Sequence, residues 1–257
     1  MGIGLDAVTA LSPNSDARAG EVLRLRREIS RMQRRRSDQA VLPLDPALSS
    51  ILPDDGLLAG TAYTLSPSPS LVLALLSAAS QKGHWCAVVG MPTLGVEAAA
   101  GFGIDLDRLI LVPDPGDRWF AATSALAEVV PLIAVHPGTR LRDADVSRLS
   151  ARLRDRGCTL LVTGVWPQSE GSIRVHDPQW NGLGAGWGLL SDRTVTVTAQ
   201  TRRRPLASSV RVRLPGRDGA LESVTTELAA LPSLPVSPAR TQSPAPAPEL
   251  LRWAEAG

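Results

Sequence analysis

The fold class follows from the stretch Thr61-Ala-Tyr-Thr-Leu-Ser-Pro-Ser-Pro-Ser-Leu-Val-Leu-Ala-Leu-Leu-Ser-Ala-Ala-Ser-Gln81 and from Trp85-Cys-Ala-Val-Val89, which comes shortly after it. Residues 61–65 form a short apolar run typical of a strand, and residues 71–81 predict a helix that ends before Gly83. Residues 85–89 resemble the buried strands of parallel sheets. A strand, a helix and a second strand in this order predict a right-handed βαβ crossover.

The same alternation continues towards the C-terminus. Short apolar runs predict strands at residues 109–112, 132–135 and 159–165, and helical patterns separate them at residues 97–103, 120–130 and 143–156. We therefore expect an α/β domain with one mainly parallel sheet and helices on both of its faces.

The pattern changes after Trp166-Pro167. Residues 194–200 and 210–214 alternate between apolar and polar side chains, as antiparallel strands do. Arg202, Arg203 and Arg204 precede a proline at the turn between these two strands. The glycines that surround Trp187 predict a turn-rich loop from residue 182 to residue 188.

Three domains are predicted: a basic N-terminal helix (residues 1–40), the α/β core (41–230) and a disordered tail (231–257). Within the core, prolines mark residues 41–60 as an irregular connector. The tail is rich in Pro, Ser and Ala, which cannot bury enough apolar surface to fold.

Both ends of the chain contain candidate partner-binding residues. In the N-terminal helix these are Val22, Leu25, Ile29 and Met32, which share one face. At the end of the tail they are Leu250, Leu251 and Trp253, an apolar group that could dock into a groove. The alternatives are a helix that packs on its own domain and a tail end without a role.

The composition indicates a well-filled core and an intracellular location. Of 257 residues, 44% are hydrophobic and 20% are charged. The longest apolar run, residues 71–79, is far shorter than the ~18 residues that a membrane span needs. The first residues do not resemble a secretory signal, so we expect a cytoplasmic protein. Cys86 and Cys158 lie in apolar runs and are interpreted as buried thiols.

The charges are distributed unevenly, although the net charge is only +2. Residues 16–36 hold eight Arg and three acidic residues, and residues 202–217 hold six Arg and no acidic residue. Residues 42–138 hold three basic and nine acidic residues. This asymmetry favours macromolecular partners over a small-molecule enzyme.

The segment between residues 65 and 71 lacks what a phosphate-binding loop needs. Such a loop uses glycines to direct backbone N–H groups at phosphates, together with a Lys and a Ser or Thr. No glycine lies between Gly60 and Gly83, and the only lysine of the chain is Lys82. Pro67 and Pro69 cannot donate backbone hydrogen bonds. No nucleotide cofactor is expected. The three histidines and two cysteines also have no metal-ligand spacing, so no metal is expected.

A resemblance is carried by His84-Trp-Cys-Ala-Val-Val-Gly90 and Glu97-Ala-Ala-Ala-Gly-Phe-Gly-Ile-Asp-Leu-Asp-Arg-Leu-Ile-Leu-Val112. Both segments resemble the part of RecA that follows its phosphate-binding helix. More specifically, residues 20–215 resemble ImuA-type proteins, which are RecA-related accessory factors of damage-induced mutagenesis, in their ATPase-degenerate actinobacterial form. This resemblance implies a RecA-like fold.

The positions that match the catalytic motifs of RecA are substituted in this chain. Gly90-Met91-Pro92 replaces the motif with the water-activating glutamate, His136 stands where the Walker B aspartate is expected, and Gly164 stands in place of the sensing glutamine. The resemblance therefore implies a protein that is not an enzyme.

The resemblance implies that the protein is an adaptor in translesion synthesis. It would bind an ImuB-type Y-family-like protein and, through it, an error-prone DnaE-type polymerase. One alternative is a relative of recombinases that binds single-stranded DNA without ATPase activity, with Arg202, Arg203 and Arg204 on phosphates. These arginines could equally be a solvated hairpin tip. Another alternative is a division inhibitor similar to SulA.

Overall fold

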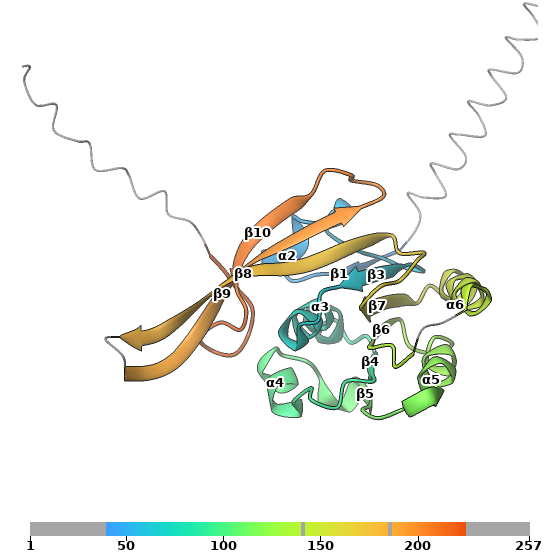
Figure 1. Cartoon of the computed structure of the whole chain (residues 1–257), viewed down its shortest axis with the longest axis horizontal. Coiled ribbons are helices and arrows are strands. Elements are labelled where there is room, and N and C mark those ends of the chain that lie inside the picture. Colours follow the sequence, from blue (N-terminus) through green and yellow to red (C-terminus); the bar gives the residue numbers. More distant parts are fainter. Residues whose placement is uncertain (1–39, 140–141, 185–186, 225–257) are drawn as a thin grey trace, which may run out of the picture. The chain divides into compact units, whose positions relative to one another are not determined.

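The computed structural model describes residues 40–139, 142–184 and 187–224 (Figure 1). The chain divides into two units between Val224 and Thr225, and the described residues all belong to the first. The predicted N-terminal helix and the predicted tail lie outside the described residues. Among the described helices, none is long and apolar enough to cross a membrane.

The first unit contains a nine-stranded sheet. In spatial order its strands are β11 (Glu222–Ser223), β10 (Ser208–Arg213), β9 (Trp187–Thr201), β8 (Gly171–Gly184), β3 (Ala62–Leu65), β7 (Thr159–Thr163), β6 (Leu132–Val135), β4 (Cys86–Val89) and β5 (Leu109–Val112). The strands from β8 to β5 are parallel to one another, whereas β9, β10 and β11 each run antiparallel to the preceding strand. The predicted α/β class with C-terminal antiparallel strands is confirmed.

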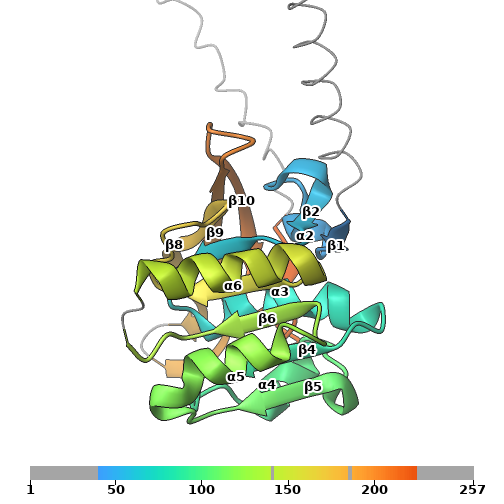
Figure 2. The ribbon, with the colours of Figure 1, turned by 90° about the vertical axis from the view of Figure 1, so that its right-hand side faces the viewer.

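Helices cover both faces of the central parallel strands β3, β7, β6 and β4, which explains their continuous hydrophobicity. In β4, Cys86 and Val88 pack in the cluster that contains α3 (Pro69–Gln81) and α4 (Val96–Gly101). The alternate residues Ala87 and Val89 pack against α5 (Trp119–Leu126) and α6 (Asp143–Arg156) on the opposite face. Figure 2 shows α5 and α6 on the near side of these strands.

Residues 41–60 are part of the core, so the prediction of an irregular connector was wrong. They form β1 (Val41–Pro43), α2 (Pro46–Ser49), the 3₁₀ turn Pro53–Asp55 and β2 (Gly56–Leu58), with β1 antiparallel to β2. Seven large side chains of this segment are buried: Leu42, Leu44, Leu48, Ile51, Leu52, Leu57 and Leu58. Pro46 and Pro53 stand in the first turns of helices, where no backbone N–H is needed, and Pro43 is the last residue of β1.

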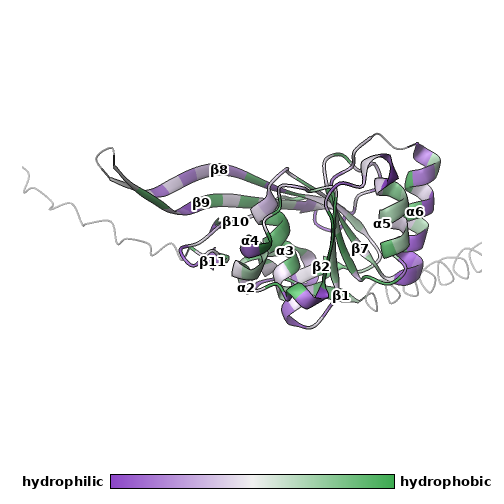
Figure 3. Cartoon of the chain, turned by 90° about the horizontal axis from the view of Figure 1, so that it is seen from below, coloured by the Kyte–Doolittle hydropathy of each residue, from purple (hydrophilic) through white to green (hydrophobic). Residues whose placement is uncertain are grey.

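The glycine-rich segment after residue 182 belongs to a β-hairpin, so the prediction of a turn-rich loop was also wrong. β8 and β9 pair from Gly171 to Gly184 and continue past the end of β10 (Figure 3). Gly182 has φ +105° at a bulge, where a Cβ atom would clash with the carbonyl oxygen of Leu189. A glycine is therefore needed for the register of this hairpin.

Candidate functional site

The connection from β3 to α3 lies at the carboxyl end of the sheet, where α/β folds of this kind bind phosphates. It consists of residues 66–68 only. The backbone N–H of Ser66 donates to the carbonyl oxygen of Ile173 over 3.1 Å, and its hydroxyl accepts from the N–H of Val175 over 3.0 Å. These bonds hold the connection against β8.

The first turn of α3 is satisfied by protein groups. The hydroxyl of Ser68 accepts from the N–H of Leu71 over 3.4 Å, and the carbonyl oxygen of Ser68 accepts from the N–H of Val72 over 3.1 Å. Pro69 occupies the first helical position and has no N–H to offer. This helix end therefore directs few free donors at a ligand.

Arg193 of β9 reaches the same helix end. Its Nη2 donates to the hydroxyl oxygen of Ser70 over 3.1 Å, and its Nε donates to the carbonyl oxygen of Leu214 over 2.8 Å. The guanidinium carbon also lies 5.2 Å from the centre of the Trp180 ring. Burial lowers the pKa of Arg193. No local sequence pattern marks Arg193, because its partners are far away along the chain.

A crevice of about 620 Å³ opens at the carboxyl ends of β6 and β7. His136 follows β6, and its Nδ1 lies 2.9 Å from the hydroxyl oxygen of Thr163, the last residue of β7. That hydroxyl is also 3.3 Å from the carbonyl oxygen of Val135. If the hydroxyl donates to this carbonyl, Nδ1 carries a proton and Nε2 is left as an acceptor.

Two indole rings form walls of this crevice. Nε1 of Trp119 donates to the hydroxyl of Thr139 over 3.3 Å. Nε1 of Trp166 is buried and has no partner within the described residues. The crevice can hold an apolar or aromatic group, but its Thr163 hydroxyl is buried and already hydrogen-bonded, so it is not placed as a nucleophile.

The buried thiols and the single tyrosine have structural roles. Burial raises the pKa of Cys86 and of Cys158 to about 12, so both remain protonated, and the interpretation as buried thiols is confirmed. Burial also raises the pKa of Tyr63, whose hydroxyl accepts from the N–H of Leu58 over 3.0 Å. Within the described residues, no group of three His, Cys, Asp or Glu side chains could hold a metal ion.

The three arginines predicted to contact DNA lie at the turn between β9 and β10. Nη1 of Arg203 pairs with Asp54 over 2.6 Å, and Nη1 of Arg204 donates to the carbonyl oxygen of Ser50 over 3.1 Å. Arg202 is exposed. Two of the three guanidinium groups therefore bind the segment before β2, which leaves Arg202 as the most accessible of the three.

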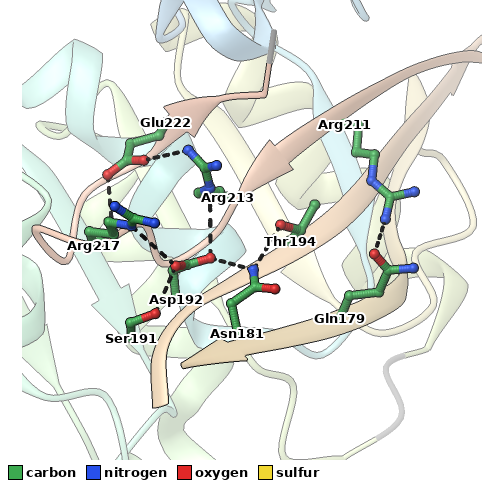
Figure 4. A network of polar contacts seen from close by, with 9 residues as sticks. All are labelled: Gln179, Asn181, Ser191, Asp192, Thr194, Arg211, Arg213, Arg217 and Glu222. Atoms are coloured by element: carbon green, nitrogen blue, oxygen red, sulfur yellow. Dashed lines mark hydrogen bonds and ion pairs between the residues drawn. The ribbon is translucent and has the colours of Figure 1, made fainter. Parts of the chain in front are cut away.

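Asp192 is the centre of a polar network that the sequence did not predict (Figure 4). It is 3% exposed and accepts from Nδ2 of Asn181 over 2.6 Å and from the hydroxyl of Ser191 over 2.9 Å. Arg213 and Arg217 lie 3.7 and 3.6 Å from its two carboxylate oxygens. These contacts, the Asn181 bond above all, lower the pKa of Asp192. The network attaches the β8–β9 hairpin, near its turn, to the end of β10.

The other predicted partner-binding residues lie outside the described residues. They are Val22, Leu25, Ile29, Met32, Leu250, Leu251 and Trp253.

The strand order and the carboxyl-end crevice define an α/β protein with a RecA-like fold. The crystal structure of the RadB recombinase has this fold, with a TM-score of 0.52 and 16% sequence identity over 70% of this chain and 97% of that chain. A family described as the MT3502 N-terminal domain matches residues 50–168. The uncharacterized protein Rv3395c of Mycobacterium tuberculosis is 38% identical over 109 residues, which are 42% of this chain. The chain spans 53% of the length of that relative.

Proposed function

We propose that this chain is a non-catalytic RecA-like adaptor in damage-induced translesion synthesis. The observation that carries the proposal is the short connection between β3 and α3. A phosphate-binding loop must leave several backbone N–H groups free for the ligand. Here Ser66 donates to β8, Ser68 caps the helix and Pro69 has no N–H.

The remaining positions around a nucleotide support the same proposal. The carboxyl end of β6 presents His136 in place of a carboxylate, and β7 ends in Thr163-Gly164. Neither an imidazole bonded to Thr163 nor a glycine would hold the magnesium ion that accompanies ATP, since this ion prefers carboxylate oxygens.

The partner of the adaptor is proposed from the resemblance of residues 84–112 to ImuA-type proteins. That resemblance favours an ImuB-type Y-family-like protein as the direct partner and an error-prone DnaE-type polymerase as an indirect one. A domain with a central sheet, together with the apolar residues that the sequence has in both terminal regions, suits a scaffold that joins other proteins.

Two measurements test this proposal. Calorimetric titration with ATP and magnesium should give no binding heat, and the full chain should capture a purified ImuB-type protein. Saturable micromolar ATP binding would contradict the loss of the nucleotide site. Capture of the division protein FtsZ, without capture of the ImuB-type protein, would favour the division inhibitor.

A further inference from the structure

Over β8, β9 and β10, the described helices leave one face of the sheet open. In β9, Val195, Val197 and Ala199 point into the hydrophobic cluster that contains α3. The alternate residues of β9 therefore point to the other side of the sheet. The cluster beneath α5 and α6 includes no residue of β8, β9 or β10, so those helices do not cover this side. We name this uncovered side of β8, β9 and β10 the outer face.

Polar side chains fill the outer face in three rows across the strands. Each row has one residue from β8, one from β9 and one from β10, set by the strand register. The rows are Arg174, Thr198 and Ser209; His176, Thr196 and Arg211; and Gln179, Thr194 and Arg213. Successive threonines are about 6.8 Å apart along an extended strand. The side chains of Thr196 and Thr198 are half-buried, whereas Thr194 is only 8% exposed and its hydroxyl accepts from Nδ2 of Asn181. The accessible hydroxyls of β9 thus lie between two columns that carry basic side chains.

Hydrogen bonds order the hydroxyls and the imidazole of the outer face. Nδ1 of His176 lies 2.7 Å from a carboxylate oxygen of Asp177, and its Nε2 lies 2.7 Å from the hydroxyl of Thr198. The hydroxyl of Thr198 lies 2.8 Å from that of Ser209. Because a carboxylate only accepts, Nδ1 donates to Asp177. This chain of contacts links all three strands and holds the hydroxyls in place.

Two guanidinium groups of the outer face are not neutralised by acidic residues. Arg174 is exposed and has no hydrogen bond or ion pair within the described residues. Arg211 donates to the neutral amide oxygen of Gln179 (Figure 4). Arg213 differs, since it pairs with Asp192 and Glu222. The positive charges of Arg174 and Arg211 are therefore available to a polyanion.

We propose that the outer face binds the phosphodiester backbone of single-stranded nucleic acid. Guanidinium and hydroxyl groups are the side chains that most often contact phosphates. The rows of these groups repeat along the strands. Such a repeat suits a linear polyanion with regularly spaced charges better than a compact anion. None of the nine residues is Phe, Tyr or Trp, and the His176 ring is held by Asp177 and Thr198, so the contact is with the backbone and is independent of base sequence. This site is separate from Arg203 and Arg204, and it adds a nucleic-acid contact to the proposed adaptor.

The experiment compares salt dependence among full-length variants. Fluorescence anisotropy with a labelled oligothymidylate gives the dissociation constant at several NaCl concentrations. Each phosphate contact on a single strand contributes about 0.7 to the slope of log K against log salt. The variant Arg174→Gln/Arg211→Gln should therefore lower the slope by about 1.4 and bind more weakly at low salt. Arg174→Lys/Arg211→Lys should keep most of the slope.

The control variant Arg118→Gln/Arg148→Gln removes the same charge elsewhere. Arg118 is exposed after β5, and the Arg148 side chain on α6 is 80% exposed. The Arg-rich residues 16–36 are present in every variant, so their contribution is common to all. Three outcomes would overturn the proposal: no salt-dependent binding by the unmodified chain, an equal loss in the control, or displacement of the oligonucleotide by polyglutamate at equal charge. The last outcome would indicate an acidic protein partner.

Discussion

The guanidinium group of Arg193 donates a hydrogen bond to the hydroxyl oxygen of Ser70 over 3.1 Å and thereby joins β9 to the first turn of α3. The two residues belong to different parts of the sequence pattern, the antiparallel hairpin and the βαβ core. At the carboxyl end of β3, where a nucleotide-binding RecA-like protein would hold phosphates, this chain has an internal contact.

We expect Arg193→Ala to destabilise the fold by about 2 kcal/mol, because hydrogen bonds of charged groups contribute about 1.5–3 kcal/mol. The substitution removes donors from Ser70 and from the carbonyl oxygen of Leu214. Urea denaturation followed by circular dichroism measures the change. Arg174→Ala is the matched control, since Arg174 has no described partner, and it should change stability by less than about 0.5 kcal/mol. Equal stability of both variants would contradict a structural role for Arg193.

Acid should weaken the attachment of the β8–β9 hairpin to β10 through protonation of Asp192. Its folded-state pKa lies below the ordinary value of 3.8, chiefly because Asn181 donates to the carboxylate. Its contribution to the free energy of unfolding is therefore present above that value and is lost as the pH falls through the folded-state pKa. Asp192→Asn should lower the urea midpoint at neutral pH, with a difference from the unmodified chain that shrinks in acid. The exposed Asp218→Asn serves as the control, and a pH-independent loss for Asp192→Asn would refute the assignment.

Both thiols should be unreactive in the folded protein. The pKa of Cys86 and Cys158 is about 12, so the thiolate fraction at pH 8 is about 10⁻⁴. Burial also blocks the approach of a reagent. We expect no labelling by a thiol-reactive disulfide reagent under native conditions and labelling of both residues in guanidinium chloride. Rapid native labelling of either thiol would contradict the described burial.

The parallel core could be predicted because its strands are buried on both faces. Continuous apolar runs such as residues 86–89 have few alternative structures, and Gly157, with φ +68°, ends α6 where the sequence predicts it. Residues 41–60 differ from the predicted connector because their buried leucines hold them in the core, and Pro46 and Pro53 lie where a helix tolerates proline. The β8–β9 hairpin was missed because glycines at every second position hide the alternation of a strand.

The candidate sites depend on contacts that no local pattern contains. Arg193 and Ser70 are 123 residues apart, and Asp192 gathers partners from three strands and a turn. A partial signal existed for His136 and Thr163, since both are polar residues at the ends of predicted apolar strands. The three rows of the outer face require the strand register, which the sequence does not specify.

The last prediction concerns the apolar end of the tail, which lies outside the described residues. Leu250 and Trp253 follow a Pro-rich stretch of the sequence, a pattern typical of a docking motif. If they anchor an ImuB-type partner, Leu250→Ala/Trp253→Ala should weaken binding by about thirtyfold, because the loss of a buried aromatic anchor costs about 2 kcal/mol. Removal of residues 232–257 should have at least this effect.

The thermal midpoint should hardly change in either variant, because every described strand and helix lies before residue 225. Leu206→Ala is the control: this leucine is 84% exposed at the turn between β9 and β10, so its loss removes a comparable apolar surface from the core domain. Isothermal titration with the purified partner gives the affinities. Unchanged affinity in both tail variants would exclude the tail as the anchor. The face formed by Val22, Leu25, Ile29 and Met32 would then be the next candidate for the interface.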